Sequence, residues 1–256
     1  MTKFSPTPNM LTLGYNLDDW HNYGIKNPIT VDISAGTNSM MCLCGMSGSG
    51  KSYALLSYVA KMKLAQPDGE FFFADYKQDD GFAFMSDCKN YFPYDRSLEA
   101  LDIIHNRFKA RQSGKDISRN PVTLIWDEYV ANILQLQAVD KKLATSVMGK
   151  VTDIILQGRS KSCKITTVQQ RGDSIVYPAG SRLNFGIIVV LGSISSARSI
   201  YEMMMPEFID EIKSKGRDFE QGEGVALLQG SKLHFIKIGA YGDFERMKQI
   251  CIDALF

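Results

Sequence analysis

The sequence predicts an α/β fold in which a mostly parallel sheet carries helices on both of its faces. Short apolar runs alternate with helical periodicities along most of the 256 residues, and this alternation is typical of parallel sheets that are covered on both sides. The composition, with 45% hydrophobic and 22% charged residues, is that of an ordinary globular protein. A chain of this length fits one α/β domain with a well-filled core.

Eight apolar runs are predicted strands, and they cover residues 29–33, 40–44, 71–74, 122–126, 165–168, 185–191, 224–228 and 233–238. Helical patterns lie between them at residues 50–65, 96–112, 138–157, 195–204 and 243–254. The clearest helix repeats apolar residues at a spacing of four, and Gly158 is placed to cap its C-terminus. The repeat consists of Val139, Leu143, Val147, Val151 and Ile155.

No internal repeat, low-complexity tract or linker divides the sequence. We therefore expect one domain over residues 13–256, a flexible N-terminal segment over residues 1–12, and a polar loop over residues 111–120. The first ten residues lack the apolar core of a signal peptide, and the longest apolar stretch, residues 187–191, is too short to cross a bilayer. We expect a cytoplasmic protein, which a partner recruits to the membrane if it goes there at all.

A net charge of +1 predicts no bulk attraction to nucleic acid or membrane, so any basic binding surface must be local. Two basic groups are candidates for phosphate contacts: Arg107, Lys109, Arg111, Lys115 and Arg119 form one, and Arg159, Lys161 and Lys164 form the other. Five cysteines are scattered along the chain. No second cysteine or histidine pair completes a metal site with Cys42 and Cys44, so we expect buried, reduced thiols.

A glycine-rich turn, GMSGSGKS, follows the strand MMCLC and precedes a helical pattern. It matches GxxxxGK[ST], a motif whose backbone N–H groups surround phosphate oxygens, while its lysine meets the β- and γ-phosphates and its hydroxyl ligates Mg²⁺. The following helix directs its positive N-terminal end toward the same anion. The predicted cofactors are ATP and Mg²⁺. The expected nucleotide-binding residues are Gly45, Met46, Ser47, Gly48, Ser49, Gly50, Lys51, Ser52 and Tyr53.

Two carboxylates end the apolar strand VTLIWDE. An aspartate at a strand end suits Mg²⁺, and an adjacent glutamate suits the attacking water. We therefore assign Asp127 with Ser52 to the metal and Glu128 to the water. In KITTVQQR, Gln170 is the candidate sensor of the γ-phosphate, with Gln169 as the alternative because a one-residue shift exchanges their faces.

Strand 71–74 lies between the two motifs in sequence, an order that suits P-loop ATPases with their own glutamate base. It suits small GTPases less well, and the sequence contains no NKxD-type motif for reading guanine. Kinases of small metabolites seldom carry this DE pair.

These residues together resemble the motor domain of the FtsK/SpoIIIE–HerA family of DNA-pumping ATPases, from about Leu13 to the C-terminus. The similar segments are LGYNLDD with NPITVDI, FADYKQDD, GRSKSCKITTVQQRGDSI, SSARSIYE and GEGVALLQG. The Gln-Arg run and the closing Gly-x-Gly distinguish this family from other P-loop ATPases. The family usually has proline where this chain has Tyr76 and Gly172. The sequence contains neither the membrane-spanning region nor the DNA-reading module of the best-known members, so it looks more like a motor of conjugative or mobile elements.

The resemblance implies a RecA-like P-loop NTPase fold, a homohexameric ring, DNA as the substrate, and a membrane or transfer complex as a possible partner. It also implies that an arginine of one subunit completes the site of the next. Arg159 and Arg198 match the family's arginine positions and are the catalytic candidates beside Lys51, Glu128 and Gln170, whereas Arg171 and Arg182 match less well. Two other functions remain open: a secretion or assembly ATPase that acts on protein, and a nucleotide-dependent binding module without turnover.

Overall fold

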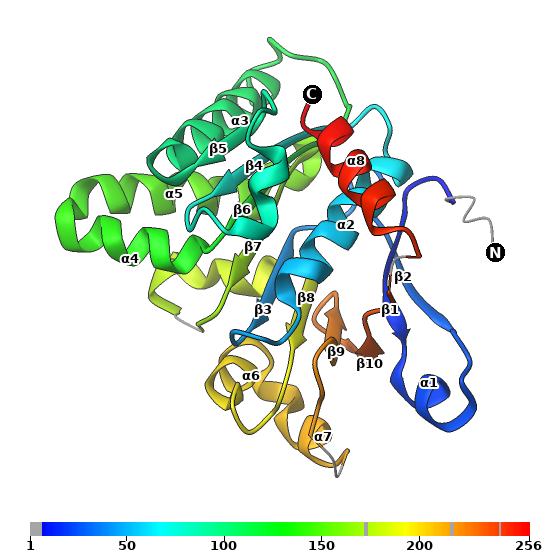
Figure 1. The fold of residues 1–256 in the computed structure, drawn as a ribbon. Coiled ribbons are helices and arrows are strands. Elements are labelled where there is room, and N and C mark those ends of the chain that lie inside the picture. Colours follow the sequence, from blue (N-terminus) through cyan, green and yellow to red (C-terminus); the bar gives the residue numbers. More distant parts are fainter. Residues whose placement is uncertain (1–6, 172–173, 216–217, 241) are drawn as a thin grey trace.

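A computed structural model describes residues 7–171, 174–215, 218–240 and 242–256 (Figure 1). The strands of this part of the chain form one ten-stranded sheet in the order β2-β1-β10-β9-β8-β3-β7-β6-β4-β5. The six strands from β8 to β5 are parallel. The other four join them through antiparallel pairs. The prediction of a mostly parallel sheet is confirmed.

The strands are β1 Met10–Asn16, β2 Pro28–Asp32, β3 Met41–Gly45, β4 Glu70–Asp75, β5 Tyr91–Pro93, β6 Val122–Asp127, β7 Cys163–Gln169, β8 Ile187–Leu191, β9 Glu223–Leu228 and β10 Lys232–Lys237. The helices are α1 Leu17–Tyr23, α2 Lys51–Ala65, α3 Ser97–Gln112, α4 Tyr129–Val139, α5 Lys141–Gln157, α6 Arg198–Met204, α7 Ile209–Lys213 and α8 Phe244–Ala254. All eight predicted strands are present, with ends shifted by at most two residues. The predicted loop 111–120 is also found, because α3 ends at Gln112 and β6 starts at Val122.

Two hydrophobic cores lie on opposite faces of the sheet, because successive side chains of a strand point to opposite sides. In β3, Cys42 and Cys44 pack toward α3, α4, α5 and α6, while Met41 and Leu43 pack toward α2 and α8. The central strands β3, β6 and β7 are buried along their whole length. All five cysteines are free and buried, as expected.

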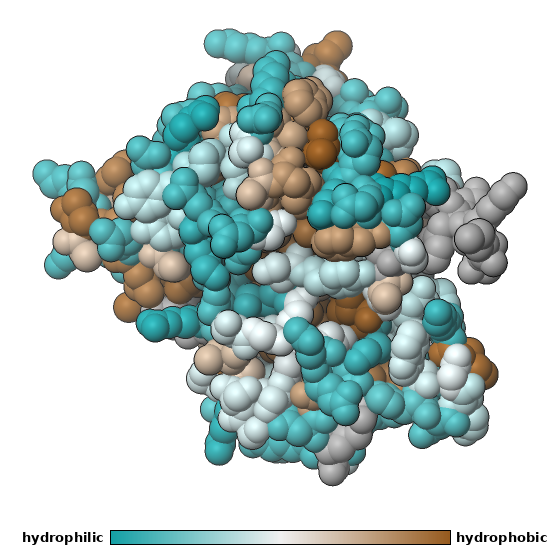
Figure 2. Space-filling model, viewed as in Figure 1, coloured by the Kyte–Doolittle hydropathy of each residue, from teal (hydrophilic) through white to brown (hydrophobic). Residues whose placement is uncertain are grey.

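The predicted helix 138–157 is two helices that meet at Asp140. The Asp140 carboxylate accepts hydrogen bonds from the backbone N–H groups of Lys142 and Leu143, at 3.0 and 2.9 Å, and so caps the N-terminus of α5. The apolar repeat is therefore buried only in its later part. Val139 is 76% exposed and Leu143 41% exposed, and apolar residues show on the surface at this outer end of the α4–α5 hairpin (Figure 2).

Gly158 ends α5, but not as the left-handed cap that we expected. Its φ of −61° is right-handed and opens a short 3₁₀ turn, Gly158–Lys161, and the left-handed residue is Ser162 with φ of 52°. Glycine is needed for a different reason. A Cβ at this position would overlap the carbonyl oxygen of Cys163.

The last three residues of the expected flexible segment, residues 1–12, belong to the sheet. Met10–Asn16 form β1, and Leu11 is fully buried against the α2 side of the sheet. The boundary was therefore placed too late by at least three residues, and residues 1–6 lie outside the described part of the chain. Among the described residues, none of the helices combines the length and the apolar character that crossing a membrane requires.

Replacing Gly158 with alanine should lower the unfolding free energy by roughly 1–3 kcal/mol, because the added methyl group must push the backbone at Cys163 aside. Gly149→Ala is the matched control. It lies in the exposed part of α5 with nothing within 4 Å of an added Cβ, so it should raise stability by up to about 1 kcal/mol. Urea unfolding of both variants measures the difference, and equal effects would contradict this account of Gly158.

Candidate active site

The glycine-rich turn lies between the end of β3 and the start of α2, at the carboxyl edge of the parallel strands. Gly50 has φ of +94°, which side chains rarely adopt, and its added Cβ would lie 3.3 Å from the backbone nitrogen of Gly222. That nitrogen donates a hydrogen bond to the carbonyl oxygen of Ser49 at 2.9 Å. The closing Gly-x-Gly segment, residues 222–224, therefore contacts the turn directly through a backbone hydrogen bond.

Lys51 is buried at the base of this turn. Its Nζ donates to the carbonyl oxygen of Met46 at 3.2 Å. Burial lowers the pKa of Lys51, and the negative charges of Glu128 and Asp127 counteract that shift. Residues 46–48 and Ser52 are exposed around the lysine. The turn thus combines a buried ammonium group with exposed backbone around it. This arrangement suits the binding of a phosphate chain.

The acidic residues follow neighbouring parallel strands, where Asp75 ends β4 beside Asp127 at the end of β6. Burial raises the pKa of Asp127 to about 8, and the charges of Glu128 and Asp75 add to the shift. Asp75 is buried but well satisfied, because it accepts hydrogen bonds from the Tyr91 hydroxyl at 2.5 Å and from the Gln78 backbone at 2.8 Å. Within the described part of the chain no such hydrogen bonds to the Asp127 side chain are found, so this carboxylate suits an added cation.

Glu128 has a left-handed backbone, with φ of 54° and ψ of 39°, and forms the N-cap of α4. This conformation costs a non-glycine residue roughly 1–2 kcal/mol and often occurs at functional sites. Gln170 comes directly after β7, and its Nε2 donates a hydrogen bond to Oε1 of Glu128. The alternative candidate, Gln169, is fully buried beneath the sheet, where its Oε1 accepts from the Tyr177 hydroxyl at 2.6 Å. The structure therefore places Gln170 at the acidic pair and Gln169 away from it.

Lys77 is a further candidate site residue, which sequence reasoning did not assign. Asp75 shapes the turn after β4 by accepting hydrogen bonds from the Gln78 and Asp79 backbones, and this turn carries Lys77. Burial lowers the pKa of Lys77, but its contact with Asp79, at 3.4 Å, and the charges of Glu128 and Asp127 raise that pKa overall. The Asp-x-Lys segment in FADYKQDD was the signal that pointed to it.

The two arginine candidates lie at different edges of the sheet. Arg159 precedes β7, at the amino edge, and its Nε donates to the Gly36 carbonyl oxygen at 2.7 Å. Because β7 has seven residues and so spans about 20 Å, Arg159 lies far from the turn of its own chain. Arg198 begins α6 on the carboxyl side and pairs with Glu202 at 2.7 Å. Arg171 is exposed and Arg182 half-buried; Gly172 lies outside the described residues.

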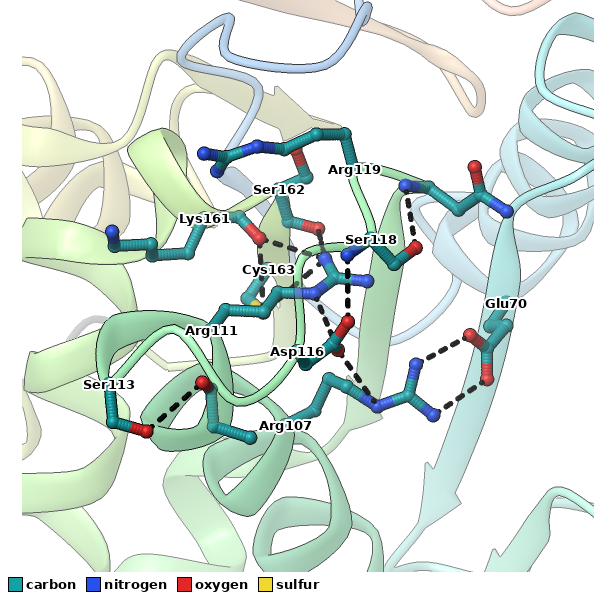
Figure 3. Close-up of polar contacts among 12 residues, drawn as sticks. Glu70, Arg107, Arg111, Ser113, Asp116, Ser118, Arg119, Lys161, Ser162 and Cys163 are labelled. Carbon is teal, nitrogen blue, oxygen red and sulfur yellow. Dashed lines mark hydrogen bonds and ion pairs between the residues drawn. The ribbon is translucent and has the colours of Figure 1, made fainter.

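Several members of the two basic groups are paired within the chain. Arg107 pairs with Glu70 at 2.9 Å, and Arg111 pairs with Asp116 at 3.0 Å and donates to the Lys161 carbonyl oxygen (Figure 3). Lys164 is buried, and its Nζ donates to the carbonyl oxygens of Ile33 and Ser34. The hypothesis of DNA contact is wrong for Arg111 and Lys164, because buried side chains that are paired within the chain cannot reach phosphates.

The donor set suits Mg²⁺. Ser52 and Asp127 offer oxygen atoms, which this cation prefers, and Mg²⁺ usually takes one or two protein ligands plus substrate phosphates and water. Accordingly, no group of three or more histidine, cysteine or acidic residues that could hold a metal is found in the described part of the chain. Asp127 is nearly buried and its pKa is raised by that burial, and this is the observation that favours a cation here.

Solved structures with the same arrangement of strands and helices are P-loop ATPases. The pCW3 conjugation coupling protein TcpA, in its monomer form with ATPγS, matches 95% of this chain and 70% of its own length, at 17% identity and a TM-score of 0.67. The fold is that of the RecA-like P-loop ATPases. No protein-family model matches the chain, and neither does the sequence of any curated protein.

Two further structures share this P-loop ATPase fold. The type VII secretion ATPase EccC of Thermomonospora curvata matches 98% of this chain at 16% identity and a TM-score of 0.64, and this chain spans only 32% of it. The genome packaging NTPase B204 of Sulfolobus turreted icosahedral virus 2, in complex with AMPPCP, matches 79% of this chain and 98% of its own length, at 15% identity and a TM-score of 0.51.

Asp127→Asn should make the nucleotide-free protein more stable at alkaline pH. Below about pH 4 Asp127 is protonated in both the folded and the unfolded chain, so its burial costs nothing there. As pH rises toward the folded-state pKa of about 8, the unfolded chain is favoured and stability is lost. The variant should therefore melt several degrees higher than the wild type near pH 8.5, and this difference should shrink steadily as the pH falls toward 4. A difference that stays constant across pH, measured by thermal melting, would contradict the raised pKa.

Proposed function

We propose that this chain is a Mg²⁺-dependent ATP hydrolase that moves DNA. The observation that carries the hydrolase assignment is Glu128, which a left-handed backbone and Gln170 hold beside a buried aspartate and near the lysine of the phosphate-binding turn. A binding module without turnover has no need of a strained glutamate at this place.

Each residue has a distinct role in this proposal. The turn and Lys51 bind the triphosphate, and Ser52 and Asp127 hold Mg²⁺, which neutralises phosphate charge when bound. Glu128 orients the attacking water and accepts its proton, while Gln170 fixes the carboxylate by its hydrogen bond. Lys77 is a second cation near the acidic pair and adds positive charge on the side of β4.

A neighbouring copy of this chain completes the site in the proposed assembly. Among the described residues, the arginine candidate Arg159 lies at the edge of the sheet opposite its own phosphate-binding turn. It is exposed and held by a hydrogen bond to Gly36. An arginine in this position can contact a nucleotide only in the site of a neighbouring subunit. We therefore infer a ring of copies, with six as the number that the sequence resemblance implies.

DNA as the substrate rests on the similar structures named for DNA-related processes, the conjugation coupling protein and the genome packaging NTPase. The alternative substrate is protein. The secretion ATPase EccC has the same fold, and one of its structures contains a signal sequence peptide. Two observations favour this alternative. Arg107 and Arg111 are neutralised by internal ion pairs, and the outer end of the α4–α5 hairpin is apolar.

Glu128→Gln should abolish ATP hydrolysis while ATP still binds, because the amide keeps the shape of the side chain but cannot accept the proton of the water. Lys51→Ala should weaken ATP binding as well, because it removes the buried cation of the turn. Isothermal titration with ATP and a phosphate-release assay separate these two effects. Wild-type turnover in both variants would refute the site assignment, and absence of turnover in the wild type would favour the binding module.

DNA should stimulate ATP turnover of the wild type, and the stimulation should weaken between low and moderate salt, because phosphate contacts release counterions.

ATP turnover per chain should also rise with protein concentration, and the mass of the particle in the presence of ATP should rise in parallel. Arg159→Ala should remove the rise in turnover. The test measures hydrolysis with duplex DNA, single-stranded DNA or an unstructured peptide, beside mass determination. Stimulation by peptide but by neither DNA would transfer the assignment to a protein-moving ATPase.

A further inference from the structure

Two aromatic rings lie next to the phosphate-binding turn. Tyr53 directly follows Ser52 in the first turn of α2, and Phe244 is the first residue of α8. Their ring centroids are 6.1 Å apart, and the ring planes differ by only 11°. The pair therefore joins the start of α8 to the start of α2. These two helices lie side by side on the same face of the sheet (Figure 1).

Backbone contacts tie the segment before Phe244 to the turn itself. Gly222 donates its N–H to the Ser49 carbonyl oxygen at 2.9 Å, and the N–H of Ile238 donates to the Gly222 carbonyl oxygen at 2.7 Å. Phe244 follows Ile238 by only six residues. The rings thus lie on the side of the turn that β9 and β10 cover, whereas Asp127 and Glu128 lie beyond β7 on the opposite side of β3.

Phe244 is not required to pack α8 on the sheet. Met247, Ile250 and Cys251 bury that helix against the core, and Tyr53 also packs against this core. Phe244 stands outside it and is 42% exposed. Lys248 places its Nζ 4.8 Å from the centre of the Phe244 ring, within the range of a cation–π contact. An exposed aromatic ring beside a nucleotide site offers a stacking surface.

We propose that Tyr53 and Phe244 form the stacking surface for the purine base of the bound nucleotide. This inference rests on the proposed function, because it places the base of the same nucleotide whose phosphates lie in the turn. In the proposed function Lys51 meets the β- and γ-phosphates and Ser52 holds the Mg²⁺, so the next residue, Tyr53, lies toward the ribose and base. A purine has a flat π-face that stacks on aromatic rings without a specific hydrogen bond. The surface therefore favours purine over pyrimidine nucleotides and distinguishes ATP poorly from GTP.

Phe244→Leu tests the proposal, because leucine keeps an apolar side chain but removes the aromatic face. The dissociation constants of AMPPCP and of inorganic tripolyphosphate are measured by isothermal titration with the full chain and Mg²⁺. The variant should bind AMPPCP about tenfold more weakly, on the scale of one base-stacking contact, and should bind tripolyphosphate as the wild type does. Phe244→Tyr should restore AMPPCP binding.

Tyr23→Leu is the matched control, since Tyr23 is an exposed aromatic residue on α1 and should change neither constant. Unchanged AMPPCP binding in Phe244→Leu would overturn the proposal. Equal weakening of AMPPCP and tripolyphosphate would also overturn it, because the ring would then only shape the turn. If the wild-type chain binds neither ligand, the proposed function fails and the base site fails with it. If the wild-type chain binds both ligands, the phosphate site is present, and the Phe244→Leu result then tests the base site alone.

Discussion

The burial of opposite charges at one edge of the sheet is the constraint on which the site depends. Lys51, Asp127 and Glu128 are all nearly inaccessible to solvent, and burying charged groups is costly unless they are paired. The raised pKa of Asp127 and the lowered pKa of Lys51 record that cost. In the proposed function, a triphosphate with Mg²⁺ supplies further partners of both signs. This charge arrangement suits a ligand that carries both a cation and an anion.

Strand β7 connects the two halves of this charge arrangement. It pairs with β3 on one side and β6 on the other, so its end lies between the phosphate-binding turn and the acidic residues. Gln170 emerges there toward Glu128, while Gln169 points into the core with Tyr177. The predicted strand 71–74, as β4, separates the two motifs in sequence only, because it lies on the far side of β6. The alternation of side chains at the end of β7 thus decides which glutamine faces Glu128.

Much of the central sheet was predictable because strands such as β3 and β6 are continuous apolar runs that end in chemically distinctive residues. The elements that were not assigned from the pattern have weaker signals. Helix α4 lacks a side-chain N-cap, because its first residue follows the left-handed Glu128, and β5 has only three residues. Helices α1 and α7 are short. The Arg107–Glu70 ion pair and the hydrogen bond from Arg111 to the Lys161 carbonyl oxygen join residues far apart in sequence, so the sequence alone made these side chains look free.

Helix α4 starts directly after Glu128, so the direction of the helix depends on the backbone of this residue. The 11 residues of α4 extend about 16 Å, so a tilt of about 10° at Glu128 displaces the far end by about 3 Å. That end is the apolar tip at which α4 meets α5. A change of backbone conformation at Glu128 would therefore be transmitted along α4 to this apolar surface, about 16 Å away.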